Sequence, residues 1–311
     1  MSNGKLVVSS SPHIRSSRTT RGVMLDVIIA LLPAFAAAII FFGPRAFLLT
    51  VVTVAASIVF EYAYCIAVKK PLTISDLSAI VTGMLLAFNM PVTLPLWMAM
   101  IGAFVAIVIT KMMFGGLGYN FANPAIVGRI VLALSFTSAM TNWVTPLSWL
   151  DGGEVLASAT PLAAGSFDTL SDAFIGNVAG CMGETSAVAL LIGGVYLIAR
   201  KVIKPIIPVA YIGTVFVLAL VAGYDPFMQI CSGGLMLGAI FMATDYVTSP
   251  VSNKGKVVFG IGCGILTVLM RFFASSPEGV SYAILLMNLL VPYIERLTTV
   301  KTFGKGGKKN G

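Results

Sequence analysis

The sequence predicts an all-α integral membrane protein with about ten transmembrane helices arranged as two inverted five-helix repeats. Of its 311 residues, 58% are hydrophobic and only 10% are charged, whereas soluble domains carry about 25% charged residues. Apolar runs of spanning length recur from Val23 to Pro292, and backbone groups in hydrocarbon must be satisfied within a helix or a closed barrel. Because these runs are continuous and do not alternate, we expect helices.

Glycine, proline and basic residues interrupt the apolar runs and set the expected helix ends. Several runs fall short of the roughly 20 residues that a full span needs, so some helices are expected to be short or broken. Ten helices are expected, over residues 23–42, 46–68, 77–90, 95–113, 123–140, 187–199, 206–222, 231–245, 257–273 and 280–297.

Basic residues indicate the orientation of this bundle. They follow every second helix, as at Lys69, Lys70 and Lys254, and cytoplasmic loops of membrane proteins carry an excess of Lys and Arg. Both termini are therefore expected in the cytoplasm. The net charge of +8 forms no basic stripe, so membrane lipid is an expected partner and nucleic acid is not.

The segment between the two sets of five helices is acidic. It contains Asp151, Glu154, Asp168 and Asp172 but no Lys or Arg, and the charge pattern places it outside the cytoplasm. The chain thus divides into a cytoplasmic arm, a first repeat, an outer loop without evident helix or strand pattern, a second repeat and a basic tail: residues 1–22, 23–140, 141–186, 187–297 and 298–311.

A short internal repeat points to a ligand site. GMLLAFNMPVTLP at 83–95 and GAIFMATDYVTSP at 238–250 share glycine, Val-Thr and proline at an offset of 155. With five helices per half, the second copy would be inverted. Asn-Met-Pro at 89–91 and Thr-Asp-Tyr at 244–246 interrupt the two copies, and paired interruptions of this kind border ligand sites near the midplane. Chance similarity of two loops is the alternative.

Charged residues lie in several apolar runs or at their ends. A charge within a span is costly and usually faces a partner or a cavity. For Glu61, Arg129 and Asp245, a functional role and a buried structural pair both remain open. The three nearest to helix ends are expected to snorkel or to cap: Asp26, Asp76 and Lys111.

The four cysteines show no metal-binding spacing. Cys65, Cys181, Cys231 and Cys263 form no CxxC pair, so no metal site is expected from this chain alone and buried thiols are the default expectation. A disulfide between Cys181 and Cys231 stays open, because both lie near the expected outer face.

A motif in the outer loop carries a family resemblance. Ala157-Ser158-Ala159-Thr160 before Pro161 resembles the flavinylation motif, usually Ser-Gly-Ala-Thr, of the D subunit of the Rnf complex and the B subunit of the sodium-pumping NADH:quinone reductase. The chain departs from that motif at its first two positions. The resemblance implies a phosphoester between FMN and the threonine hydroxyl, made by a flavin transferase outside the cytoplasmic membrane.

Further matches extend along the chain. They comprise Phe-Gly-Gly-Leu-Gly-Tyr-Asn at 114–120, Asn-Pro-Ala at 123–125, Gly-Arg at 128–129, Gly-Glu-Thr-Ser at 183–186 and Ala-Thr-Asp-Tyr at 243–246. The family implies cofactor-binding roles for some residues of these motifs and of the flavinylation motif. Those residues are Thr160 with Ser158 and Ala159, then Asn123, Arg129, Glu184, Thr185 and Asp245. The Gly-Glu-Thr-Ser motif also leads into the sixth expected helix, and the dipole at the N-terminus of that helix would suit a phosphate.

The resemblance implies an electron-carrier protein in the bacterial cytoplasmic membrane. In that family, covalent FMN passes electrons within a translocase that exchanges them between ferredoxin and NAD and moves Na+ or H+, together with the A, B, C, E and G subunits. A noncovalent flavin, riboflavin in the related reductase protein, is a further expectation at the repeat interface. The short N-terminal arm favours the Rnf type over the reductase type. The other alternative is a channel or secondary transporter of the urea-transporter kind without a redox role.

Overall fold

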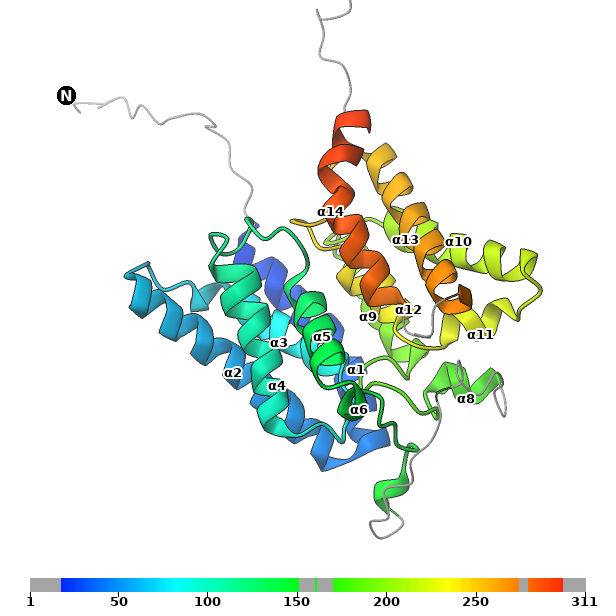
Figure 1. Ribbon diagram of the computed structural model, residues 1–311, viewed down its shortest axis with the longest axis horizontal. Coiled ribbons are helices and arrows are strands. Elements are labelled where there is room, and N and C mark those ends of the chain that lie inside the picture. The colour runs from blue at the N-terminus through cyan, green and yellow to red at the C-terminus, as the bar shows by residue number, and fades with distance from the viewer. Residues whose placement is uncertain (1–17, 151–159, 161–169, 274–278, 299–311) are drawn as a thin grey trace, which may run out of the picture.

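The chain folds into a bundle of helices. The computed structural model describes residues 18–150, 160, 170–273 and 279–298, and every regular element within these ranges is helical (Figure 1). Four helices in the described ranges are long and apolar enough to cross a membrane: α1 (Thr20–Phe42), α2 (Pro44–Val68), α13 (Asn253–Phe273) and α14 (Val280–Thr298).

Shorter apolar helices fill the positions between these four. Each lies within a few residues of a predicted helix, as the apolar runs require. They are α3 (Ser78–Phe88), α4 (Leu96–Phe104) continued by the π-helix η2 (Val105–Met112), α5 (Pro124–Ser135), α9 (Ala187–Ala199) and α10 (Ile206–Val221).

Local chemistry explains several of the helix starts. The hydroxyl of Thr19 accepts a hydrogen bond from the Gly22 amide at 3.2 Å before α1, and the side chain of Asn123 accepts one from the Ala125 amide at 3.0 Å before α5. Such side chains satisfy amide groups that the first helical turn leaves without partners. Pro124 at the first position of α5 needs no amide partner.

The helix predicted over 231–245 is broken, which corrects the expectation from sequence. The structure has α11 (Pro226–Cys231), α12 (Leu235–Leu237) and the π-helix η4 (Gly238–Met242) instead. Gly233 lies at φ 63°, in the left-handed region that glycine tolerates best. The helix predicted over 123–140 is similarly interrupted after Ser135, with the short α6 (Thr137–Met140) following it.

The segment between the halves contains helices that the sequence pattern did not predict. These are the 3₁₀ turn η3 (Ser148–Leu150) and α8 (Leu170–Ile175). The Trp149 indole donates to the Ile40 carbonyl at 3.2 Å, and the Leu147 amide donates to the Phe41 carbonyl at 2.7 Å. This part of the segment is therefore held at the C-terminal end of α1.

The helices form two groups that lie side by side. In Figure 1, α1 to α5 occupy one side and α9 to α14 the other, with α8 at the lower right beneath α11. The start of α1 and the end of α14 point toward the upper side of this view, opposite α8. The two groups meet where α1 packs against α9 and where α5 packs against α14.

Small residues allow α1 and α9 to approach closely. A Cβ atom added to Gly193 would overlap the carbonyl oxygen of Ala30, and one added to Gly194 would lie 2.9 Å from Ile240. Ala34 on α1 is also fully buried. Close packing of this kind drives helix association in lipid, where the hydrophobic effect between helices is absent.

We predict that Gly193→Ala destabilises the protein by about 1–3 kcal/mol, because the added methyl group overpacks the contact between α1 and α9. The matched control is Gly213→Ala on α10, where an added Cβ has no neighbour within 4 Å and a small gain in stability is expected from helix propensity. Thermal unfolding in detergent measures both changes. Equal stability of the two variants would contradict the proposed contact.

Candidate cofactor site

A cavity of about 100 Å³ lies between the two groups of helices. Most of its wall is apolar and comes from α1, α3, α5, α9 and η4. Several polar side chains interrupt this apolar wall: Ser78, Thr82, Lys111, Asn120, Asn123, Thr244 and Asp245. An apolar cavity with a few converging polar groups is the usual form of a small-molecule site.

The broken helices of the two halves meet beside this cavity. The Asn89 amide, at the C-terminal end of α3, contacts the Met242 sulfur at 3.5 Å, and the Asn123 amide donates to the Met242 carbonyl at 3.2 Å. Asn123 thus caps α5 with its oxygen and holds the end of η4 with its nitrogen. The two interruptions that the repeat singled out are therefore neighbours in space.

Asp245 is a half-buried carboxylate on the cavity wall. It accepts hydrogen bonds from the Thr248 hydroxyl at 3.0 Å and from the Val247 amide at 3.5 Å. Among the residues that the structure describes, Asp245 forms no ion pair. The sequence left open a functional role or a buried structural pair for Asp245. The described chain shows no structural pair of Asp245 with a Lys or an Arg.

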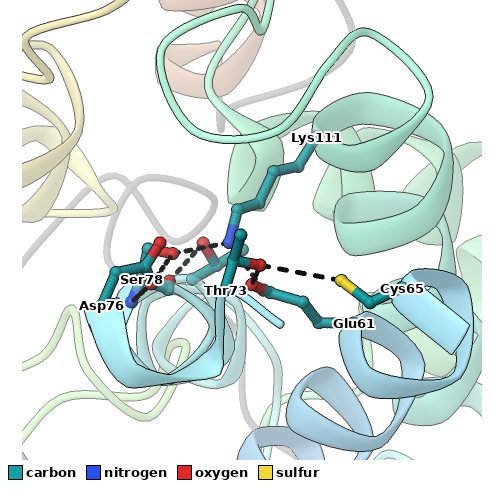
Figure 2. A network of polar contacts seen from close by, with 7 residues as sticks. Glu61, Cys65, Thr73, Asp76, Ser78 and Lys111 are labelled. Atoms are coloured by element: carbon teal, nitrogen blue, oxygen red, sulfur yellow. Dashed lines mark hydrogen bonds and ion pairs between the residues drawn. The ribbon is translucent and has the colours of Figure 1, made fainter. Parts of the chain in front are cut away.

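Lys111 and Glu61 form a buried ion pair at one edge of the cavity (Figure 2). The Lys111 ammonium lies 2.6 Å from Glu61 and donates to the Ser78 hydroxyl, also at 2.6 Å. Thr73 donates to the other Glu61 oxygen at 2.5 Å, and the Cys65 sulfur lies 3.8 Å from the Thr73 hydroxyl. Glu61 is therefore a buried, paired charge.

The expectation that Lys111 snorkels toward water is wrong. Its side chain is 3% exposed and lies between α2 and α3, because η2 directs it into the bundle and Glu61 compensates its charge. Asp76 caps α3 as expected, accepting from the Ser78 amide at 2.8 Å. Asp26, near the start of α1, pairs with Arg200 at 3.3 Å.

A second buried cluster surrounds Arg129 on α5. The guanidinium donates to the Ser281 hydroxyl at 2.6 Å and lies 3.4 Å from Glu184 and 3.6 Å from the Cys181 sulfur. The structure thus brings together Arg129 and Glu184, two of the predicted site residues. Because Ser281 begins α14 and Arg129 lies on α5, the cluster also joins the two groups of helices.

The remaining predicted site residues lie in the segment that separates the halves. Thr160 is described and is 6% exposed, whereas Ser158 and Ala159 lie outside the described residues. The Thr185 hydroxyl is buried and has no hydrogen-bond partner within the described chain. Cys181 and Cys231, like Cys65 and Cys263, are buried, and none of the four forms a disulfide.

Four polar cavity residues were not predicted from sequence: Lys111 as an inward-facing charge, Ser78, Thr82 and Asn120. In the sequence, Lys111 is a cation at the end of one apolar run, and Glu61 is a carboxylate within another. Considering every carboxylate of a span as a partner for every cation of a span would have suggested this contact. Ser78 and Asn120 carry no signal of this kind, since neutral polar residues are frequent at helix ends.

The fold and the cavity define a class: an all-helical, multi-pass membrane protein with a polar-edged cavity between two helical groups. The chain belongs to the NQR2, RnfD, RnfE family, whose model matches residues 7–304.

Three relatives, each the D subunit of a membrane complex, are similar over almost their full length. The chain is 46% identical to that of the Na(+)-translocating ferredoxin:NAD(+) oxidoreductase complex of Acetobacterium woodii, over 98% of this chain and 97% of the relative. It is 40% identical to that of the proton-translocating ferredoxin:NAD(+) oxidoreductase complex of Clostridium ljungdahlii, over 96% of each. It is 37% identical to that of the ion-translocating oxidoreductase complex of Stutzerimonas stutzeri, over 92% of each.

We predict that Lys111→Met costs about 3–5 kcal/mol of stability, because it leaves the Glu61 carboxylate buried without a counter-charge. The double variant Glu61→Gln/Lys111→Met removes both charges and is expected to lose less than the single variant. Thermal unfolding in detergent of the wild type, both single variants and the double variant measures the coupling. Additive losses would show that the two charges do not interact.

Proposed function

We propose that this chain is a membrane electron carrier within an ion-translocating ferredoxin:NAD oxidoreductase complex. The observation that carries the proposal is similarity over nearly the whole chain to relatives named as the D subunit of such complexes. The chain would act with partners of the A, B, C, E and G types and would not be catalytic alone. Its own contribution would be to place flavins and to tune their electrostatic surroundings.

The first flavin is a covalent FMN on Thr160. The threonine is 6% exposed, so a flavin transferase must reach it before it is buried. A hydroxyl needs activation to act as a nucleophile, and the transferase would supply it. Burial suits a fixed carrier, because a phosphoester at this position would lie against protein and not swing in open water.

The second flavin is noncovalent and occupies the cavity between the helix groups. The wall residues match an isoalloxazine ring in polarity, because the ring is planar and largely apolar with hydrogen-bonding groups along its edge. Asn120 has a side-chain oxygen without a hydrogen-bond partner in the described chain, and Asp245 offers a carboxylate without a cation among the described residues. When bound, the flavin would supply the redox chemistry, and these side chains would orient its polar edge.

The proposed architecture is an inverted repeat in a bacterial cytoplasmic membrane with both termini inside. Its support is the contact of α1 with α9 and of α5 with α14, which pairs the first helix and the last helix of each half and is compatible with a pseudo-two-fold relation. The start of α1 and the end of α14 also share one side of the bundle, opposite α8 (Figure 1). A urea-transporter-like channel would have the same architecture, so fold alone does not separate the two functions.

The ion that moves is Na+ or H+. The two relatives at 46% and 40% identity carry names with different ions, so membership of the family leaves the ion open. Asp245 is the proposed ionisable group of this step, because a carboxylate without a cationic partner within the described chain faces the cavity.

We predict that Thr160→Ala abolishes acid-stable flavin fluorescence on a denaturing gel, because no hydroxyl remains to form the phosphoester. Ser158→Ala, which removes the neighbouring hydroxyl, is the matched control and should keep the fluorescence. Peptide mass analysis of the wild type should find the added FMN mass on Thr160. Fluorescent Thr160→Ala protein would refute the attachment site, and a wild type without covalent flavin would favour the channel.

We predict that a membrane-impermeant maleimide labels Leu150→Cys from the outer face and Val251→Cys from the cytoplasmic face. Leu150 is 62% exposed and Val251 is 79% exposed. The four native cysteines are buried, so we expect little maleimide labelling of the wild-type protein. Intact cells and inside-out vesicles provide the two sides. The reverse pattern would overturn the orientation and with it the access of an external transferase to Thr160.

A further inference from the structure

A chain of polar contacts connects one face of the bundle to the cavity (Figure 2). It starts at Asp76, a half-buried carboxylate that follows the basic pair Lys69 and Lys70. The Ser78 hydroxyl donates to Asp76 and accepts from the Lys111 ammonium at 2.6 Å. Both Ser78 and Lys111 line the cavity. Acid, hydroxyl and ammonium thus follow one another in direct hydrogen-bond contact.

One N–H group of the Lys111 ammonium, at the cavity end of these polar contacts, has no partner among the described residues. An ammonium carries three N–H groups, and Glu61 and Ser78 accept two of them. The third has no hydrogen-bond partner among the described residues, and the side chain borders the cavity. Lys111 also lies on η2, a π-helix of eight residues; π-helical turns are rare and occur frequently at functional sites.

A purely structural role would not require the whole chain of contacts. Glu61 alone compensates the charge of Lys111, and Thr73 satisfies the second Glu61 oxygen. Neither interaction needs Ser78 or Asp76. Buried ion pairs are moreover weak contributors to stability compared with apolar packing. Asp76 caps α3 through the Ser78 amide, and its further contact with the Ser78 hydroxyl adds a path for protons between the surface and the buried ammonium.

We propose that Asp76, Ser78 and Lys111 form a proton relay that delivers protons from the Asp76 side of the bundle to a redox ligand in the cavity. The relay rests on the proposed noncovalent flavin, because a flavin that accepts electrons also accepts protons. The proposed topology places Asp76 on the cytoplasmic side. The relay sets how fast charge on the ligand is neutralised.

Each proton that leaves the relay is replaced from water. One N–H bond of the Lys111 ammonium would break, and its proton would pass to a basic atom of a ligand reduced by electrons from the ferredoxin side of the complex. Asp76, a carboxylate that accepts from the Ser78 hydroxyl at rest, would take up a proton from water. The Ser78 hydroxyl would then turn and give its proton to the neutral amine while it takes the proton of Asp76, which becomes a carboxylate again. Every group ends in its starting state.

Neighbouring charges favour this cycle. Once Lys111 is neutral, Glu61 is a buried carboxylate without a counter-charge, which is strongly unfavourable and so drives the return of a proton to the amine. The other ionisable groups around Lys111 in the described chain are Cys65, which contacts Thr73, and Asp245 and Tyr246, which line the same cavity.

The test uses the whole complex and two relay variants. Ser78→Ala removes the relay hydroxyl but leaves the pair between Lys111 and Glu61 intact, and Asp76→Asn keeps a hydrogen-bond acceptor that can no longer carry a proton. Thr73→Val is the matched control, since it removes a hydroxyl from the same network outside the relay. Stopped flow with reduced ferredoxin measures flavin absorbance and, through a pH-indicator dye, proton uptake.

We expect Ser78→Ala and Asp76→Asn to slow both signals by about 10-fold or more, within the range of lost general acid–base steps, and Thr73→Val to stay within about 2-fold of the wild type. Ser78→Thr should restore the rate, and imidazole, a small weak acid, should partly rescue Asp76→Asn. The equilibrium potential of the noncovalent flavin should not change, because a relay alters a rate and not a midpoint.

Three outcomes would overturn the relay: wild-type rates in both relay variants, equal losses in Thr73→Val, or a shifted potential that accounts for the slower rate. If Ser78→Ala fails to assemble, the rate of Asp76→Asn with and without imidazole decides. Absence of any acid-extractable flavin from the wild-type complex would instead overturn the proposed occupant of the cavity. The two failures are therefore separable.

Discussion

A bilayer offers no water to polar groups, so every helix break and every buried charge must find its partner inside the bundle. This constraint gathers the polar chemistry of the chain where its two helix groups meet. The end of α3 meets the end of η4 through Asn89 and Met242, and Asn123 caps α5 while holding η4. The cavity lies beside these contacts, and the interruption after η4 supplies Thr244, Asp245 and Tyr246 to its wall.

The charges around the junction are unevenly matched. Lys111 is neutralised by Glu61, and Arg129 lies beside Glu184, whereas Asp245 has only hydrogen-bond donors within the described chain. Removing a charge from water costs several kcal/mol unless it is compensated. A half-buried carboxylate without a counter-ion is therefore expected where a ligand, a cation or a proton completes the site, and the cavity is the place that would receive it.

Much of the fold follows from hydropathy, and the cavity only in part. Long apolar runs predict α1, α2, α13 and α14 within a few residues, since any such run in lipid must become a helix. The break at Gly233 was missed because an apolar run hides a glycine that adopts a left-handed conformation. Lys111 was misjudged because position in the sequence gives depth but not the direction of a side chain. Its partner Glu61 is 50 residues away, so only the packing of η2 against α2 brings them together.

The junction of the two helix groups is the proposed site of the noncovalent flavin. The most direct measurement is the acid-extractable flavin per purified chain in the wild type, in Leu117→Trp and in Tyr119→Trp. Leu117 lines the cavity, whereas Tyr119, in the same loop, is 73% exposed. We expect about one extractable flavin in the wild type and in Tyr119→Trp, and strong loss in Leu117→Trp with the covalent flavin retained. Equal flavin in all three proteins, or none in the wild type, would contradict this site.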